Sequence, residues 1–479
     1  MNPLSLQQIA DWCGGSLLQG SPDAVVSRVC TDSRQAQTGD LFLAIPGERF
    51  DGHDFLGEVA GKGAAAVVIE KSRASGLGLS CGVITVENPR AALGKLAANY
   101  RASLNLHAVA VGGSNGKTTT KELLASVLRQ RFATLASEAS FNNEVGVPIT
   151  LLKLDAKHQA AVLEVGTNHP GELAPLVKMI QPEFGVITCI GREHLEFFND
   201  LGGVADEEGW LAELLPARGK LFVNGDTPEI HRILSRAKAP VVRVGWTEGN
   251  DWRVREVRVD ADGTTFKVES PYEAFSGEYR LQLLGRHQAG NALLALAVGT
   301  ELGLTREQAA RGLAECAPPK MRLQLKEING VHILDDAYNA NADSMLASLD
   351  TLCELPCEGR RVAVLGDMAE LGLQSHAAHI EVGERAAELG LSHLFAVGKM
   401  APILSEAARS RGFRAVSEFE DVGAAANAVR DFVRAGDLVL IKASRATRLE
   451  RISETLATTG APPLGGAGNG RLRQTAMTI

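Results

Sequence analysis

Short apolar runs that end in glycine or proline recur in the first segment of the chain. They lie at residues 41–47, 64–70 and 82–89, and they are rich in valine and isoleucine. Runs of this length bounded by turn residues are typical of strands. The pattern predicts a small α/β domain over residues 1–89.

Strand-like and helix-like stretches alternate in a second segment, residues 90–314. A helical stretch at 90–101 precedes the buried-strand pattern HAVAV, and further strand-like runs are AAVLEVG and FGVITCIG. Such alternation predicts right-handed crossovers and a parallel sheet. In WRVREVRV, TTFKV and YRLQLLG apolar and polar positions alternate instead, with Asp262 and Gly263 between two of the runs. This change predicts an antiparallel edge or flap, followed by a helix that begins near Gln288.

A third segment, residues 315–457, repeats the alternation. Its strand-like runs are VHILDD, RVAVLGD, HLFAVG and DLVLIKAS. They predict a Rossmann-like, doubly wound sheet, and the absence of G-x-G-x-x-G gives no indication of a dinucleotide. Residues 458–479 are rich in glycine, alanine and proline, which predicts a flexible tail. The expected fold class is α/β with three domains, and a length of 479 residues fits that number.

Composition narrows the range of partners. The net charge of -8 argues against a nucleic-acid partner, because such proteins usually carry a basic surface, but an anionic small substrate needs only local positive charge. The 7 cysteines form no C-x-x-C pair, so neither a disulfide framework nor a zinc ribbon is indicated. Neither a signal peptide nor a membrane-spanning run is apparent in the sequence. We expect a cytoplasmic monomer without membrane insertion.

The strand HAVAV runs into GGSNGKTTT and then into a helical pattern. Glycines 113 and 116 let backbone N–H groups surround phosphate oxygens, while Lys117 reaches the β- and γ-phosphates and Thr118 can bind Mg²⁺. The match to the full P-loop pattern is imperfect, since Val111 stands where its first glycine belongs. The order of strand, loop and helix favours phosphate binding over a simple glycine-rich turn.

Two polar residues follow later strand-like runs. Glu164 ends one run and His194 follows another, so in a parallel sheet both fall at the carboxyl edge beside the P-loop. With Thr118 they could hold one or two Mg²⁺ ions. Alternatively, Glu164 caps a helix and His194 is an ordinary loop residue. The pair His376 and His379, at i,i+3 spacing, is predicted to lie on a solvated helix face.

The order of several segments resembles the Mur ligases of peptidoglycan synthesis. These segments are GGSNGKTTT, SFNNEVGVP, EVGTNHPGE, EHLE, GRHQAGNALLALA, DDAYNANADSM, LGDMAELG and KASRATRLE. The segments GERFDGHDF, DDAYNANADSM and LGDMAELG are most similar to members that add D-alanyl-D-alanine to UDP-N-acetylmuramoyl-tripeptide. The resemblance implies an N-terminal domain for the UDP-sugar, a central ATPase domain and a C-terminal domain that closes over the site. It also implies ATP and Mg²⁺ as cofactors and amide formation through an acyl phosphate.

The resemblance also implies roles for individual residues. The catalytic residues would be Lys117, Glu164, His194 and Arg322. The ATP-binding residues would be Gly113, Ser114, Asn115, Gly116, Lys117, Thr118, Thr119, His287, Asn291, Arg322 and Asp336. The substrate-binding residues would be Ser33, Arg34, Asp51, His53, Asn142, Asn143, Tyr338, Asn339 and Asn341. The metal ligands would be Thr118, Glu164 and His194.

One departure from the family concerns the metal site. Most Mur ligases carry a carbamylated lysine after the HLE motif, and here Asp206 and Glu208 fall where relatives carry lysines. Our hypothesis is that Glu208, at the modified position, supplies the carbamate's negative charge directly and is a fourth metal ligand. The alternative is that Glu208 is a solvated helix residue. Ala342 and Ala443 replace residues that are often proline and glycine in relatives, which bears on loop shape rather than on chemistry.

Other functions remain as alternatives at this point. The nearest is another amide ligase of the superfamily, such as a folylpolyglutamate synthase or a different Mur ligase. A P-loop nucleotide-binding regulator is a rival from another class, although the sequence has no N-K-x-D guanine motif. A purely structural protein would need neither the P-loop nor the polar residues at strand ends.

Overall fold

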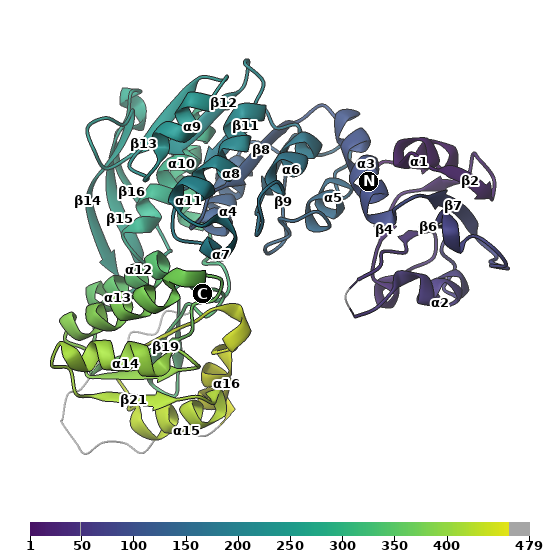
Figure 1. Cartoon of the computed structure of the whole chain (residues 1–479). Helices are drawn as coiled ribbons and strands as arrows, with labels where there is room; N and C mark the ends of the chain where they lie inside the picture. Colours follow the sequence, from purple (N-terminus) through teal and green to yellow (C-terminus); the bar gives the residue numbers. More distant parts are fainter. Residues whose placement is uncertain (48, 459–479) are drawn as a thin grey trace, which may run out of the picture. The chain divides into compact units, whose positions relative to one another are not determined.

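A computed structural model describes residues 1–47 and 49–458 of the chain (Figure 1). The described part is α/β with parallel-rich sheets, so the predicted fold class is confirmed. By its internal contacts the chain divides into two units, Met1–Pro319 with Glu370–Leu373, and Lys320–Ala369 with the residues from Gln374 onward. The domain boundaries predicted at residues 89 and 314 stay predictions. The predicted tail at 458–479 lies outside the described residues, except that Thr458 ends a helix.

The first part of the chain forms a five-stranded sheet in the order β2-β7-β6-β5-β4, parallel except between β2 and β7. Its strands are β2 (Ser16–Gln19), β4 (Val29–Cys30), β5 (Leu41–Leu43), β6 (Ala66–Glu70) and β7 (Gly82–Val86). A two-stranded antiparallel pair and two helices accompany it: β1 (Leu4–Ser5), β3 (Val25–Val26), α1 (Leu6–Cys13) and α2 (Leu56–Gly61). The three predicted strands of this segment correspond to β5, β6 and β7.

The middle of the chain forms a nine-stranded sheet in the order β16-β15-β14-β13-β12-β11-β8-β10-β9. Its strands are β8 (His107–Gly112), β9 (Thr134–Ala136), β10 (Ala160–Glu164), β11 (Phe184–Ile187), β12 (Lys220–Asn224), β13 (Val241–Gly245), β14 (Trp252–Asp260), β15 (Gly263–Glu269) and β16 (Gly277–Leu281). Its helices, with the preceding α3, are α3 (Pro89–Ala102), α4 (Lys117–Leu128), α5 (Gly146–Leu151), α6 (Leu173–Ile180), α7 (Leu195–Phe198), α8 (Leu201–Leu214), α9 (Ile230–Arg236), α10 (His287–Glu301) and α11 (Arg306–Glu315). All neighbouring strands from β9 to β14 in this order, including β8, pair in parallel. Strand β15 pairs antiparallel with both β14 and β16, as the alternation of apolar and polar positions predicted.

Strand β8 lies buried within the middle sheet. Its alanine and valine side chains at 108–111 are fully buried, and helix α4 packs its apolar face, which includes Leu123, Leu124 and Val127, into the same core. A strand covered on both faces reads as a continuous apolar run, which is why HAVAV predicted a central parallel strand. This packing fixes the loop between β8 and α4 at the carboxyl edge of the sheet.

The second unit contains a six-stranded sheet in the order β17-β18-β22-β19-β20-β21, parallel except between β17 and β18. Its strands are β17 (Gln324–Ile328), β18 (Val331–Asp335), β19 (Arg361–Gly366), β20 (His393–Val397), β21 (Val416–Phe419) and β22 (Leu438–Lys442). Its helices are α12 (Ala342–Glu354), α13 (Ser375–Glu388), α14 (Ala401–Ser410), α15 (Val422–Phe432) and α16 (Glu450–Thr458). The predicted doubly wound pattern is confirmed, although β17 and β21 were not predicted.

His379 does not lie on a solvated face, so that prediction is wrong. It is 1% exposed and packs on the same face of α13 as Val382 and Ala386. Its Nδ1 lies 2.7 Å from the carbonyl oxygen of Ser375, and its Nε2 accepts a 3.1 Å hydrogen bond from the Met368 amide. Both ring nitrogens therefore have structural partners, and burial lowers the pKa of His379.

Tyr100, near the end of α3, ties three separate stretches of the first unit together. Its hydroxyl donates to the Leu154 carbonyl at 2.6 Å and accepts from the Asn2 amide at 2.8 Å. Tyr100 is 1% exposed, so Tyr100→Phe would leave both backbone groups without their partner. We expect a loss of about 1–3 kcal/mol in the free energy of unfolding, measured by urea denaturation. The matched control Tyr272→Phe removes a hydroxyl from a residue that is 51% exposed and should cost less than about 0.5 kcal/mol. Equal losses in the two variants would contradict this role of Tyr100.

Candidate nucleotide-binding site

The loop between β8 and α4 has a conformation that requires glycine at two positions. Gly113 and Gly116 have φ values of +106° and +86°. A Cβ on Gly113 would lie 2.4 Å from Oγ1 of Thr188, and one on Gly116 would lie 2.6 Å from Oδ1 of Asn291. Both the left-handed backbone and the lack of space exclude larger residues. The loop therefore leads directly into the start of α4, where helix N–H groups can bind a phosphate, while the amides of Gly113, Ser114 and Asn115 donate to Glu208 and Cys189.

The segment that follows β11 supports this loop. The Ser114 amide donates to the Cys189 carbonyl at 2.8 Å, and the Gly191 amide donates to Oγ of Ser114 at 2.8 Å. Strands β8, β10 and β11 are neighbours in parallel register, with Gly112 opposite Ile187 and Val111 opposite Glu164. The carboxyl ends of these strands thus meet at one edge, as expected from the sequence.

Lys117, the first residue of α4, folds its side chain back over the loop. Its Nζ donates to the carbonyls of Gly113 at 2.5 Å and Ser114 at 3.0 Å, and it lies 3.2 Å from Oε2 of Glu193. Burial by itself lowers the pKa of Lys117, but the charges of nearby carboxylates, Glu193 foremost, outweigh burial and raise it. Lys117 is therefore held as a cation at the mouth of the loop. Sequence reasoning missed Glu193 because it lies in an irregular segment without periodicity.

Glu164, at the end of β10, is 1% exposed. Its Oε1 accepts a 2.9 Å hydrogen bond from Nδ2 of Asn142, so the structure brings these two predicted site residues together. The buried Lys121 of α4 fixes the segment before Asn142 by donating to the carbonyls of Ser137 and Ala139 at 2.7 and 2.9 Å. Sequence reasoning did not assign Lys121, although it is one helical turn from Lys117.

Glu208, on α8, lies directly beneath the loop. Its Oε2 accepts a 2.7 Å hydrogen bond from the Gly113 amide, and it is 1% exposed, so the alternative of a solvated helix residue is wrong. Burial raises the pKa of Glu208 to about 7, against the opposing effect of Lys117. The neighbouring Glu207 accepts hydrogen bonds from the amides of Gly171 and Leu173 at 2.9 and 2.8 Å, and so satisfies backbone donors at the start of α6.

His194 adopts a left-handed backbone, with φ of +49°, immediately before α7. Its Nδ1 lies 2.5 Å from Oε2 of Glu370, a residue of the short segment that belongs to the first unit. Its Nε2 lies 4.0 Å from Oε2 of Glu193. Glu193 thus lies between Lys117 and His194. Glu370 carried no sequence signal either, because it is distant along the chain.

The acidic side chains of this edge have the chemistry for a divalent cation. Oε2 of Glu164 and Oε1 of Glu208 are buried and lack hydrogen-bond partners, which is costly for a carboxylate unless a cation or a proton satisfies it. However, no cluster of three or more histidine, cysteine, aspartate or glutamate side chains in the described residues is arranged to hold a metal ion. Mg²⁺ usually takes only one or two carboxylates together with phosphate oxygens and water, so Glu164 and the hydroxyl of Thr118, in the first turn of α4, fit it.

Helix α10 carries the predicted adenine contacts at its start. His287 is the first residue of α10, and Asn291 follows one turn later. Nδ2 of Asn291 donates to Oε1 of Gln288 at 2.9 Å, while Oδ1 lies against Gly116 of the loop. Asn291 is therefore adjacent to the phosphate loop.

The predicted site residues of the second unit occupy a compact cluster of their own. Asp336 is engaged by Lys442 at 2.5 Å, by the Ser348 hydroxyl at 2.6 Å and by the Leu323 amide at 3.1 Å. The carbonyl of Asn339 accepts from Lys442 at 3.0 Å. The guanidinium of Arg322 stacks 4.3 Å from the ring centre of Tyr338, and Asn341 caps α12 by accepting from the Ser344 amide at 2.9 Å. These contacts show what holds Asp336 and Asn341 in place, and their roles toward ligands stay predictions.

The predicted UDP-sugar residues lie in the first part of the chain. Asp51 accepts from the backbone and the ring of His53 at 3.0 and 2.7 Å, and these contacts hold the pKa of Asp51 below its usual value. Arg34 is exposed and pairs with Asp32 at 2.7 Å, whereas Ser33 is buried. In the middle of the chain Asn143 accepts from the Val145 and Gly146 amides at the start of α5. Their roles as substrate contacts also stay predictions.

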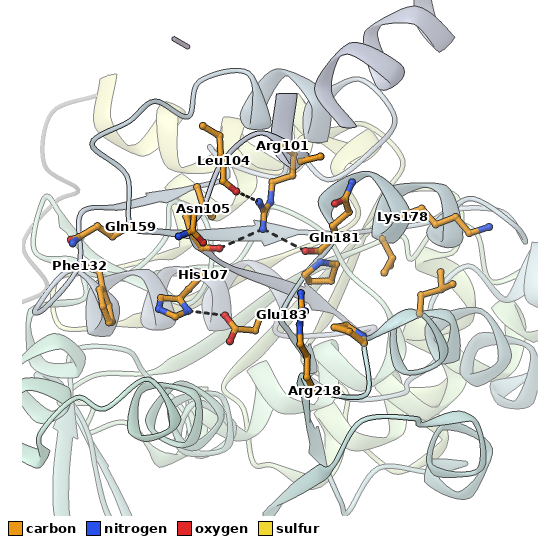
Figure 2. Close-up of a pocket in the computed structure, with 16 residues that line it drawn as sticks. Arg101, Leu104, Asn105, His107, Phe132, Gln159, Lys178, Gln181, Glu183 and Arg218 are labelled. Carbon is orange, nitrogen blue, oxygen red and sulfur yellow. Dashed lines mark hydrogen bonds and ion pairs between the residues drawn. The ribbon is translucent and has the colours of Figure 1, made fainter. Parts of the chain in front are cut away.

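A cavity of about 830 Å³ lies at the opposite edge of the middle sheet (Figure 2). It is lined by His107, at the start of β8, and by Gln159 and Glu183, which precede β10 and β11. Arg101 donates to the Leu104 carbonyl at 3.0 Å, and His107 pairs with Glu183 at 2.7 Å. Because the cavity lies at the amino ends of the strands, it is separate from the phosphate loop at their carboxyl ends.

Models of three Mur ligase domains match successive parts of the chain. The Mur ligase family catalytic domain matches residues 25–101, the Mur ligase middle domain residues 111–299, and the Mur ligase glutamate ligase domain residues 321–445. Together they cover the phosphate loop, Glu164, His194 and Glu208, as well as the Asp336 cluster.

Individual relatives match over nearly their whole length. The chain is 35% identical over 468 residues to the UDP-N-acetylmuramoyl-tripeptide–D-alanyl-D-alanine ligase of Escherichia coli (strain K12), covering 96% of this chain and 100% of the relative. The crystal structure of MurF from Acinetobacter baumannii is 32% identical, covers 96% of this chain and 100% of its own, and has a TM-score of 0.87. The MurF ligase of Thermotoga maritima in complex with ADP is 29% identical over 90% of this chain and 97% of its own, with a TM-score of 0.78. The chain therefore belongs to the Mur ligase family, whose members are ATP-dependent ligases.

Proposed function

We propose that this chain joins D-alanyl-D-alanine to UDP-N-acetylmuramoyl-tripeptide at the expense of ATP, in the synthesis of peptidoglycan precursors. The observation that carries the proposal is near-full-length similarity to ligases of that name, 35% identical over 96% of the chain for the Escherichia coli relative. The glycine loop that presents Lys117 at the carboxyl edge of a parallel sheet supplies the matching chemistry.

The proposed reaction has two steps. A carboxylate oxygen of the tripeptide attacks the γ-phosphorus of ATP, and ADP leaves, which gives an acyl phosphate. The amine of D-alanyl-D-alanine then attacks the acyl carbon, and the tetrahedral intermediate expels phosphate to form the amide while the amine loses a proton. Such phosphoryl transfer depends on positioning and on neutralising charge rather than on a nucleophilic side chain.

The geometry and the family resemblance support the following roles for individual residues. Lys117 and the N–H groups at the start of α4 would bind the phosphates, with Asn291 next to the nucleotide. Thr118 and Glu164 would hold Mg²⁺, which neutralises phosphate charge when it is bound, and His194 and Glu208 stay candidates for a second ion. Arg322 and Asp336 stay predicted nucleotide contacts. Tyr338 and Asn339 would face the dipeptide.

The setting of the enzyme is also a proposal. In the described part of the chain no helix is long and apolar enough to cross a membrane. A cytoplasmic location, a monomeric state and the absence of a nucleic-acid partner stay predictions. The net charge of -8 supports the absence of a nucleic-acid partner but not the other two.

Phosphate release from ATP in the presence of UDP-N-acetylmuramoyl-tripeptide tests the proposed function. We expect release to depend on D-alanyl-D-alanine, with one phosphate for each amide product detected by mass spectrometry. A panel of single amino acids, including glutamate, is the control and should support little release. Release that does not depend on the dipeptide would overturn the assignment and favour a nucleotide-binding regulator, while dependence on a single amino acid would indicate another ligase.

A further inference from the structure

Lys117 is bound by an ion pair within the chain. Its Nζ lies 3.2 and 3.4 Å from the two carboxylate oxygens of Glu193, and the two side chains are only 14% and 12% exposed. Water screens a pair of this kind much less than a surface pair, so the attraction is strong. A nucleotide phosphate that is to bind Lys117 must therefore compete with Glu193 for the same ammonium group.

The surroundings of Lys117 carry an excess of negative charge. Besides Glu193, the carboxylates of Glu208 and Glu164 also act on the ammonium. Glu208 also accepts the Gly113 amide and Oε1 of Glu164 also accepts from Asn142, whereas both carboxylate oxygens of Glu193 face the Lys117 ammonium. Glu193 is thus the carboxylate whose charge a phosphate group would meet most directly.

We propose that Glu193 competes with nucleotide phosphates for Lys117, and that its charge makes tight nucleotide binding depend on a divalent cation. The proposal rests on the nucleotide-binding role of Lys117 proposed above. When phosphates take over Lys117, the carboxylate of Glu193 loses its ion pair and remains close to their negative charge. That repulsion is strong because the Glu193 side chain is only 12% exposed, and a bound divalent cation reduces it by neutralising part of the phosphate charge. Glu193 therefore selects against nucleotide that arrives without a metal ion.

Binding of ADP to Glu193→Gln, measured by titration calorimetry on the full chain, tests the proposal without any turnover. For the wild-type protein we expect ADP to bind more tightly with Mg²⁺ than with EDTA. In Glu193→Gln the Kd for ADP in EDTA should fall by about tenfold or more, because one partly buried charge that repels the phosphates is gone. The Kd with Mg²⁺ should change by less than about threefold, so the dependence of ADP binding on Mg²⁺ shrinks.

Two further variants separate charge from folding. Glu193→Asp keeps the charge and should keep the wild-type ratio of the two Kd values. Asp206→Asn removes an exposed carboxylate that pairs with Arg232 on the far side of α8, and should leave both Kd values unchanged. An unchanged Kd in EDTA for Glu193→Gln would overturn the inference alone. Weaker ADP binding only with Mg²⁺ would also overturn it, since it would identify Glu193 as a metal ligand. If the wild-type protein bound no ADP, the proposed function would fail as well.

Discussion

Replacing Lys117 with methionine should lower kcat/KM for ATP by about 10³-fold or more and weaken ADP binding in the presence of Mg²⁺. The reason is the charge balance around the loop. Lys117 is the cation on which Glu193, Glu208 and Glu164 all act. Without it the phosphates would lose an ammonium ligand and would also face carboxylates whose charge Lys117 no longer offsets. The effect should therefore exceed the loss of one ordinary hydrogen bond. Initial rates of phosphate release and ADP calorimetry measure it.

Two other lysine variants make the Lys117 result specific. Lys153→Met removes a lysine whose side chain is 39% exposed and pairs with Glu138, and it should change kcat/KM by less than about twofold. Lys117→Arg keeps the charge, but a planar guanidinium does not fit the point at which Nζ meets the Gly113 and Ser114 carbonyls, so we expect it to recover only part of the activity. Wild-type ADP affinity in Lys117→Met would show that the phosphates bind elsewhere.

The layout of the nucleotide site could be predicted from the sequence because it depends on local pattern and on sheet geometry. The apolar run HAVAV, the glycines of the loop and the helical face of α4 follow one another in the chain, and each has its own signal. Glu164 and the segment that leads to His194 follow other buried strands, and parallel strands present their carboxyl ends at one edge. The antiparallel strands β14 to β16 could also be predicted from the sequence, because apolar and polar positions alternate on both sides of Gly263.

The missed features depend on contacts between residues distant in the sequence. Glu193 and Glu370 lie in irregular segments, so nothing in their neighbourhood indicates that they approach Lys117 and His194. His379 is buried because it lies on the face of α13 that packs inward. The prediction was wrong because the i,i+3 spacing placed His379 on the same face as His376, which is exposed.

For Glu208 a signal was present in the sequence. It lies four residues after Val204 and three before Leu211, on the stripe of α8 that is buried. An acidic residue on such a stripe either has a hydrogen-bond or ion-pair partner or carries a proton at a pH where a carboxyl is normally ionised. This distinguishes Glu208 from the exposed Asp206 two residues earlier. Periodicity alone could indicate that Glu208 is buried, but the Gly113 amide as its partner required the fold.

The buried carboxyl of Glu208 should make the protein less stable as pH rises from about 5 to 8. Its pKa in the folded chain is about 7 against an ordinary value of 4.5, because burial disfavours the charged form. The folded state therefore holds a proton that the unfolded state has lost, and stability falls as pH rises through this window. The difference corresponds to about 3 kcal/mol once both states are ionised. In Glu208→Gln the amide oxygen can still accept the Gly113 N–H and no proton is involved, so this part of the pH dependence should disappear.

The measurement is the free energy of unfolding of Glu208→Gln minus that of the wild-type protein, by urea denaturation in EDTA at several pH values between 5 and 8. We expect this difference to rise with pH in favour of the variant. Asp206→Asn changes the same charge on the same helix at a side chain that is 56% exposed, so its curve should run parallel to that of the wild-type protein. Parallel curves for Glu208→Gln as well would show that Glu208 ionises normally in the folded chain. Repeating the series with Mg²⁺ and ADP tests the hypothesis of Glu208 as a metal ligand, because a cation bound to its carboxylate would stabilise the wild-type protein at pH 8 more than the variant.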